Sequence, residues 1–235
     1  MTPRHLLIAL LVPMTGGFGF ALAKAGLGHF PPLLLMGMRF AIAALLLVWF
    51  VPLPRGHWRS LIVIALISAT FQYGLSFTGL SMIDATPAIL LVQSEVMFGT
   101  VIAAVVLKER PTRRQFAGTV IAFAGIVTIV GAPSLEGQMT GVLLILSGCL
   151  FWACGQVMVR RLGDVMSGFQ MTAWIGMIAA PQMLLASALI EGNPLPALMA
   201  APAFAWGTVL YLGVVMTVIG YSAWYFLLSK YPVPM

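Results

Sequence analysis

Long apolar runs, separated by short polar or proline-rich segments, dominate this 235-residue chain. A helix needs about 20 apolar residues to cross the hydrocarbon core of a bilayer, and about eight runs approach that length. We place them at residues 6–23, 33–51, 61–79, 87–107, 116–131, 140–158, 169–190 and 203–228. The pattern therefore predicts an all-α polytopic membrane protein with about eight transmembrane helices.

The composition agrees with a membrane protein. Hydrophobic residues make up 61% of the chain and charged residues only 8%, whereas a soluble domain carries about 25% charged residues. The connections between runs, such as residues 52–56 and 191–194, are short and rich in proline and glycine. They leave no room for a soluble domain, so we expect the function to lie within the helical bundle.

The formal net charge of +6 does not indicate a nucleic-acid partner, because the basic residues form no single block. They fall in alternate connections, while Asp84, Glu136 and Glu191 fall in the others. The positive-inside rule then places the amino terminus and the basic connections in the cytoplasm. The basic residues assigned to the cytoplasmic side are Arg4, Arg55, Arg59, Lys108, Arg110, Arg113, Arg114, Arg160, Arg161 and Lys230.

Two segments of the chain resemble each other. Residues 71–81 and 219–229 share a tyrosine and a Leu-Ser pair in the same register. A five-helix unit inverts when it is repeated, and inverted repeats are typical of secondary transporters. We expect a first repeat at residues 1–133 and an incomplete second one of three helices at residues 134–235, with the last two helices missing.

Three stretches carry a resemblance to a known family: residues 17–20, residues 30–41 and residues 107–118. The last stretch contains a Leu-Lys-Glu-Arg turn followed by Gln115 and Gly118. Together they resemble the EamA family of the drug/metabolite transporter superfamily. The resemblance implies ten helices and export of amino acids or related metabolites. Within the family, the chain is most similar to bacterial exporters of cysteine and O-acetylserine.

Glu95 is the most informative single residue, since it lies near the centre of the uncharged run at residues 87–107. Hydrocarbon solvates an isolated carboxylate very poorly, so such a residue is usually functional. The functional alternatives are proton coupling and binding of a substrate amine. The structural alternative is a carboxyl group packed against Gln72 or Gln156.

Polar and aromatic side chains recur at helical spacing in three of the predicted spans. One stripe contains Ser68, Gln72 and Ser76. These stripes can line a shared cavity for an amphipathic solute, or they can hydrogen-bond and pack between helices. The candidate substrate-binding or coupling residues are Glu95, Gln72, Ser76, Trp152, Gln156, Tyr221, Trp224 and Arg39.

Arg39 and the first span each have two interpretations. The long stem of Arg39 can snorkel to the membrane surface, or its guanidinium group can face the cavity and attract a carboxylate. In the first span, Pro13, Gly16 and Gly17 can form a hinge or allow close packing. The small residues at positions 118, 122 and 125 share one helix face and predict a packing contact.

No Gly-x-Ser-x-Gly or His-Glu-x-x-His pattern occurs in the sequence, so nothing indicates an intramembrane enzyme. His5, His29 and His57 lie near span ends, and we expect no metal and no cofactor. The preferred function is export of amino acids or related small metabolites by alternating access, with protons as a possible second substrate. An intramembrane enzyme and a non-transporting membrane scaffold are the alternatives.

Overall fold

The computed structural model describes residues 3–106, 112–130, 137–162 and 165–223. These residues fold into helices joined by turns, and no strand occurs among them. Within the same ranges, seven helical stretches are long and apolar enough to cross a membrane. This confirms the prediction of an all-α polytopic membrane protein. The stretches are His5–Gly26, Pro32–Phe50, Trp58–Met82, Ala85–Val106, Met139–Val159, Gly168–Glu191 and Ala203–Ala223.

The remaining predicted span, residues 116–131, falls on helix α7 (Arg113–Val130). The apolar part of α7, Arg114–Thr128, is shorter than the seven other stretches. The number of membrane crossings and the inverted repeat therefore stay predictions.

Contacts between helices divide the chain into two compact units. One unit contains Met1–Leu61 and Val165–Met235, and the other is Ile62–Asp164. The predicted repeats, residues 1–133 and 134–235, concern similarity of sequence rather than packing. That division of the chain therefore stays a prediction as well.

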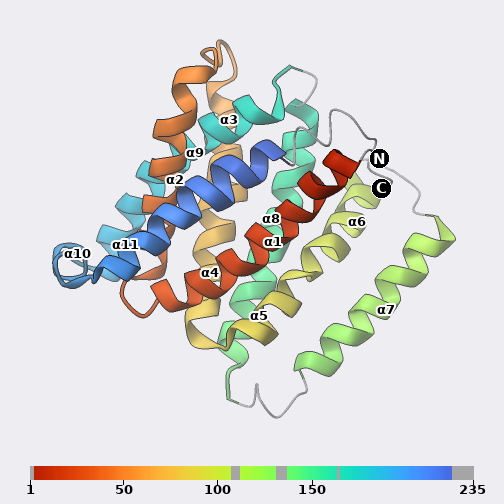
Figure 1. Cartoon of the computed structure of the whole chain (residues 1–235). Coiled ribbons are helices and arrows are strands. Elements are labelled where there is room, and N and C mark those ends of the chain that lie inside the picture. The colour runs from red at the N-terminus through yellow and green to blue at the C-terminus, as the bar shows by residue number, and fades with distance from the viewer. Residues whose placement is uncertain (1–2, 107–111, 131–136, 163–164, 224–235) are drawn as a thin grey trace. The chain divides into compact units, whose positions relative to one another are not determined.

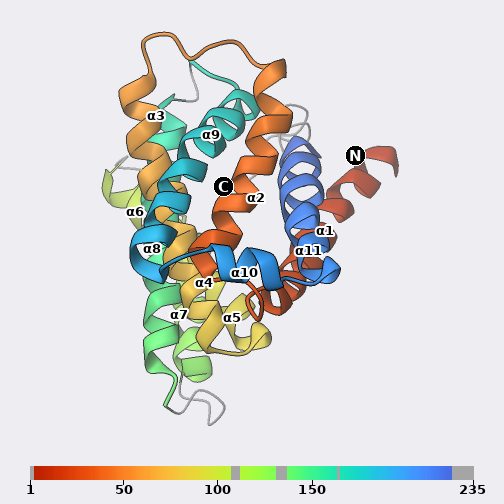
Figure 2. The same cartoon turned by 90° about the vertical axis from the view of Figure 1, so that its left-hand side faces the viewer.

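The first unit is built around α2 (Pro32–Leu47), which packs along α9 (Gly168–Ala186), as Figure 2 shows. Gly37 permits this close approach, because a Cβ atom there would lie 2.8 Å from the Leu184 side chain. Beyond α9, the helix widens into a π-helical segment. The unit also contains α1 (Pro3–Gly26), η1 (Val48–Phe50), the π-helix η4 (Ser187–Glu191), α10 (Leu195–Ala200), α11 (Ala203–Leu210) and the π-helix η5 (Tyr211–Ile219).

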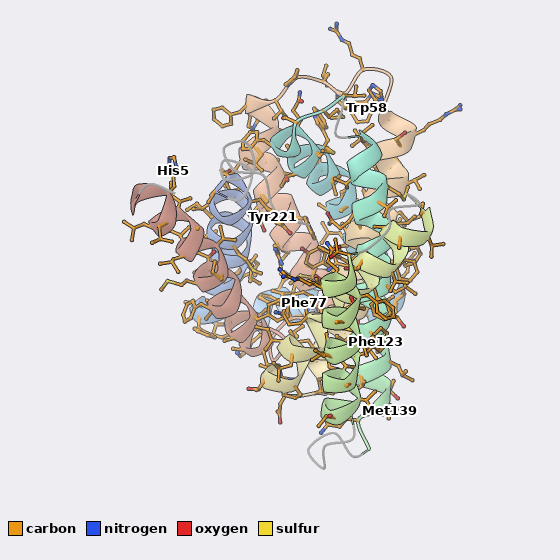
Figure 3. The ribbon with its side chains drawn as sticks, turned by 90° about the vertical axis from the view of Figure 1, so that its right-hand side faces the viewer. His5, Trp58, Phe77, Phe123, Met139 and Tyr221 are labelled. Carbon is orange, nitrogen blue, oxygen red and sulfur yellow. The ribbon has the colours of Figure 1, made fainter. Side chains whose placement is uncertain are left out.

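A pair of tryptophans fixes one end of this unit. Trp58, labelled in Figure 3, packs edge-on against Trp174, with 5.3 Å between the ring centroids. The indole N–H of Trp174 donates a 3.0 Å hydrogen bond to the carbonyl oxygen of Pro52. The connection after η1 is therefore tied to α9, which limits how far α2 and α9 can slide past each other.

At the other end, Glu191 caps α2 from a distant part of the chain. Its two carboxylate oxygens accept hydrogen bonds from the backbone N–H groups of Leu33 (2.8 Å) and Leu34 (3.1 Å). The residue before α2 is Pro31, which provides no side-chain cap. Because the first N–H groups of a helix lack partners within the helix, Glu191 fills this role and also matches the helix dipole.

We predict that Glu191→Ala lowers the stability of the folded protein by about 1 kcal/mol, the usual effect of removing a helix cap. Asp84→Ala is the matched control, because Asp84 also precedes a helix but is exposed and makes no cap hydrogen bond. Thermal unfolding in detergent measures both. Equal melting temperatures for the two variants would show that the Glu191 cap contributes nothing.

The second unit is organised by α8 (Met139–Leu162), which packs against four other segments of its unit. These are the π-helix η2 and helices α4, α5 and α6, whereas α7 contacts α5 and α6. The bounds are Trp58–Ala65 for α3, which enters this unit, Leu66–Phe71 for η2, Gln72–Met82 for α4, Ala85–Val92 for α5 and Ser94–Val106 for α6.

Glycines seven residues apart bring α8 against η2 and α4. Gly141, Gly148 and Gly155 lie on one face of α8. A Cβ atom on Gly148 would collide with the Ser76 hydroxyl, and one on Gly155 would collide with Ser68. Ser68 and Ser76 thus lie in this glycine seam, which favours interhelical packing over cavity lining for both serines.

We predict that Gly148→Ala destabilises the protein by about 1–3 kcal/mol, the range for overpacking a well-packed contact. The added methyl group would also lie 2.8 Å from the Gln72 carbonyl oxygen, so backbone must move. Gly118→Ala is the control, because a Cβ atom there meets nothing within 4 Å. The relevant measurement is thermal unfolding. If Gly148→Ala melted at the wild-type temperature, α8 would not pack against α4 as closely as described.

The small-residue face of α7 does not pack as the sequence suggested. Gly118, Ala122 and Gly125 are all exposed, and a Cβ atom on either glycine meets nothing within 4 Å. A described contact of α7 is instead aromatic: Phe123, labelled in Figure 3, lies edge-on to Phe98 with 6.4 Å between ring centroids. For the described part of the chain, the predicted packing contact is wrong.

Candidate functional site

The helical stretch that contains Glu95, Ala85–Val106, has a one-residue irregularity at Gln93, which we call the break. Helix α5 ends at Val92 and α6 begins at Ser94, so that the two follow each other along one path in Figure 1. Around Gln93 the backbone forms shorter-range hydrogen bonds, from Gln93 N–H to Leu90 and from Val96 N–H to Gln93. This break frees backbone groups inside an apolar span, and these groups need partners within the protein.

Cys149 of α8 supplies one such partner. Its thiol lies 3.8 Å from the carbonyl oxygens of both Leu91 and Val92, at the end of α5, and can donate to either. Cys149 is fully buried, and Cys149 and Cys154 are both free thiols. This contact between α8 and the break was not predicted from the sequence.

Glu95 lies in the first turn of α6. The Gln72 amide donates to the Glu95 carboxylate over 3.5 Å, from Nε2 to Oε1. A charge-assisted hydrogen bond of this kind is usually 2.7–2.9 Å long. The contact confirms Gln72 as a neighbour of Glu95, and its length leaves the carboxylate able to take a stronger partner.

Two buried oxygen atoms at the break are reached by no oxygen or nitrogen donor among the described residues: Gln72 Oε1 and Ser94 Oγ. Gln72 is 5% exposed and Ser94 is fully buried. Leaving a buried polar atom without a hydrogen bond lowers the stability of the fold by about 1–3 kcal/mol. Such atoms are rare in folded proteins, and a bound ligand is one explanation for them. Sequence reasoning missed Ser94, although the polar triplet at residues 93–95 inside an apolar run was a visible signal.

The other predicted residues of this unit have different positions. Trp152 is half-buried and faces α6 beside Gly99, about one turn beyond Glu95. Gln156 is exposed, and Gln72 rather than Gln156 bonds Glu95. The structure therefore gathers Glu95, Gln72 and Trp152 along α6 and leaves Gln156 on the outside of this unit.

Arg39 belongs to the first unit and is completely buried near the middle of its span. Its Nε–H donates a 2.9 Å hydrogen bond to the Thr217 hydroxyl, and its guanidinium carbon lies 5.5 Å from the Phe40 ring centroid. The alternative in which Arg39 snorkels to the membrane surface is therefore wrong. A buried guanidinium group is expensive in an apolar environment and is a candidate for function.

The π-helix η5 positions Thr217 for this contact. The Thr217 hydroxyl donates to the carbonyl oxygen of Leu212, five residues earlier, over 2.8 Å, and accepts from Arg39. Gly213 brings η5 close to α2, since a Cβ atom there would lie 3.2 Å from the Arg39 carbonyl oxygen. Segments of π-helix are frequent at functional sites.

Tyr221 is half-buried just beyond η5 and is labelled in Figure 3, whereas Trp224 lies outside the described residues. Tyr221 and Arg39 belong to the first unit, and Glu95 belongs to the second. A substrate role for these residues stays a prediction. Among the described residues, no group of three or more histidine, cysteine, aspartate or glutamate side chains could hold a metal ion.

The predicted hinge lies within α1, which is one helix despite Pro13. A Cβ atom on Gly16 or Gly17 would meet nothing within 4 Å, so packing does not require glycine at either position. Gly19 differs, because a Cβ atom there would lie 2.6 Å from the Met216 sulfur. The packing explanation thus applies to Gly19, and hinging at Pro13, Gly16 and Gly17 stays a prediction.

We predict that the double variant Gly16→Ala, Gly17→Ala is as stable as the wild type or more stable, because alanine costs about 0.5–1 kcal/mol less than glycine in a helix. If this segment bends during transport, the flux through the variant falls while its melting temperature does not. Proteoliposome flux and thermal unfolding are measured together. Unchanged flux would rule out the hinge.

Comparison with known proteins identifies the chain. The EamA-like transporter family matches residues 4–131 and residues 139–235. The chain belongs to this family. The match confirms the resemblance inferred from the sequence. The family is one of multi-pass membrane transporters and not of enzymes. This agrees with the seven apolar helical stretches found among the described residues.

Two relatives are described as a "Probable amino-acid metabolite efflux pump". The one from Salmonella typhimurium strain LT2 is 32% identical, and the one from Escherichia coli strain K12 is 28% identical. In both, the alignment covers 98% of this chain and 80% of the relative. A solved structure described only as "Crystal structure of protein" superposes with a TM-score of 0.69 at 21% identity, covering 97% of this chain and 79% of the other. That likeness supports the EamA fold alone.

Proposed function

We propose that this EamA-family protein exports amino acids or related small metabolites across the bacterial inner membrane. The names of the two efflux-pump relatives support this substrate class. The observation in this chain that carries the proposal is the interrupted span, where a carboxylate and two unsatisfied oxygen atoms lie in an apolar environment. Secondary transporters commonly bind their solutes at discontinuous helices near the bilayer midplane.

The proposed mechanism is alternating access with the amino terminus in the cytoplasm. A polar solute loses its hydration when it enters the span, and Glu95, Gln72 and Ser94 would replace part of it. Bending of α1 at Pro13 would then change which side of the membrane is open. A non-transporting scaffold has no use for a loosely bonded carboxylate in its centre, so the geometry at Glu95 favours transport over this alternative.

Flux measurements test the proposal directly. The folded protein is reconstituted in liposomes and assayed with cysteine, O-acetylserine, threonine and aromatic amino acids. Specific flux of at least one of these solutes is expected. If none moves, although the protein is folded and correctly inserted, the proposed export function is wrong.

We predict that Glu95→Gln abolishes net flux driven by a pH gradient, because the amide keeps the volume of the side chain but cannot ionise. Asp84→Asn is the matched control, since it neutralises an exposed carboxylate outside the span and should leave flux unchanged. Both variants are compared at equal amounts of folded protein. Wild-type flux through Glu95→Gln would exclude Glu95 from the transport mechanism.

The same variant separates the two proposed roles of Glu95. If Glu95 carries protons, Glu95→Gln retains solute-for-solute exchange but loses accumulation driven by a pH gradient. If Glu95 binds the solute, exchange and gradient-driven accumulation are both lost. Exchange assays run with and without a gradient therefore distinguish proton coupling from solute binding.

A further inference from the structure

We propose that the break between α5 and α6 is a subsite for a primary ammonium group, formed by the Glu95 carboxylate, Gln72 Oε1 and Ser94 Oγ. This inference rests on the proposed export function and defines what the site recognises. It predicts that the transported solute carries a free, unacylated amine. Residues Gln72 and Ser94 become specificity-determining residues beside Glu95.

The three groups offer what a primary ammonium ion needs. An ammonium group has one positive charge and three N–H donors, and it accepts no hydrogen bonds. In its ionised form Glu95 supplies the opposite charge, while Gln72 Oε1 and Ser94 Oγ are buried acceptors that no oxygen or nitrogen donor among the described residues reaches. The donors of the ligand thus match acceptors that the protein leaves open, and two of these acceptors are at least nine-tenths buried.

The contacts place these groups around one point of the chain. The Gln72 amide donates to Glu95 through Nε2, so Oε1 of the same planar amide lies next to the carboxylate. Ser94 precedes Glu95 in the chain, and the Cys149 thiol makes weak hydrogen-bonding contacts with the Ser94 hydroxyl and the Glu95 backbone. All three acceptors therefore belong to the surroundings of the break, within a single packing unit.

The helix ends favour a cation as well. The carbonyl groups of Leu91 and Val92 are contacted only weakly, by the Cys149 thiol at 3.8 Å, and present partial negative charge at the break. The first turn of α6 already holds Glu95. A free anion would meet both the carboxylate and these carbonyl groups, so the site disfavours carboxylates and phosphates.

The acceptor set also predicts selectivity among amines. An N-acetylated amine has lost its charge and has one N–H donor, so it would leave buried acceptors unfilled. A site built to hydrogen-bond a substrate group rejects analogues that lack this group far better than an apolar pocket rejects a change of size. We expect N-acetylation to weaken binding at least ten-fold, and removal of the solute's carboxylate to weaken it less at this subsite.

Competition during exchange tests this prediction. Proteoliposomes loaded with a transported amino acid exchange it for labelled solute in the presence of three competitors. These are the unlabelled amino acid, its N-acetyl derivative and its decarboxylated amine. The amino acid and the amine should compete, and the N-acetyl derivative should not. Equal competition by the N-acetyl derivative would overturn the ammonium subsite.

Ser94→Ala provides a second, independent readout. Because no oxygen or nitrogen donor reaches Ser94 Oγ in the described structure, its removal should leave the melting temperature unchanged or raise it. The same variant should weaken competition by the amine at least several-fold. Ser147→Ala, an exposed serine on α8, is the matched control. A purely structural Ser94 would instead lower the melting temperature and leave competition unchanged.

The outcomes separate this inference from the export function. Flux without discrimination between the free and N-acetylated amines contradicts the ammonium subsite and leaves export intact. If no solute is transported, ligand-induced shifts of the melting temperature still test the subsite. The free amine should then stabilise the wild-type protein, and the N-acetyl derivative should not. A lack of stabilisation by the free amine would overturn the subsite.

Discussion

Backbone groups released inside an apolar span must find partners within the protein, and the centre of the second unit follows from this constraint. The interruption at Gln93 leaves carbonyl groups of α5 facing α8, where the Cys149 thiol meets them. Helix α8 can lie this close because one of its faces carries only hydrogen atoms at Gly141, Gly148 and Gly155. The same seam holds Gln72 where its amide reaches Glu95.

Each packing unit combines an irregular helix with a polar group that the bilayer disfavours. In the second unit, the broken span begins again at Ser94, directly before Glu95. In the first unit, the π-helix η5 turns the Thr217 hydroxyl towards the buried Arg39. A regular helix hydrogen-bonds its own backbone and leaves little to offer a ligand. Local irregularity thus accompanies a buried polar contact in each unit, Thr217 with Arg39 and the residues Ser94 and Glu95 with Cys149.

The fold could be predicted from the sequence because membrane spans depend on length and apolar composition, which are local properties. The predicted ranges around Arg39 and Glu95 coincide with helical stretches, and Gln72 was correctly named as a neighbour of Glu95. The break itself was missed, since residues 87–107 contain no glycine or proline between Pro87 and Gly99 to signal it. The Cys149 thiol that contacts the break is distant in sequence.

Small residues show more clearly that contacts between distant parts of the chain cannot be predicted from local sequence. The faces of α7 and α8 both carry glycines at helical spacing, yet only the α8 face is packed within the described chain. Spacing identifies a face on which a neighbour could approach, but whether one does depends on tertiary structure. Arg39 is similar: its long stem permits snorkelling, and its burial against Thr217 depends on a helix distant in sequence.

The strength of the contacts differs between the ends of the spans and the break. Glu191 holds the start of α2 with two charge-assisted hydrogen bonds of 2.8 and 3.1 Å. At the break, a thiol at 3.8 Å and an amide at 3.5 Å are the described side-chain contacts, and thiols are weak donors. Rearranging the break therefore costs less than detaching α2 from its cap. A transporter must exchange partners at its binding site repeatedly while its helices stay assembled, and weak contacts at the break with strong ones at the span ends meet both requirements.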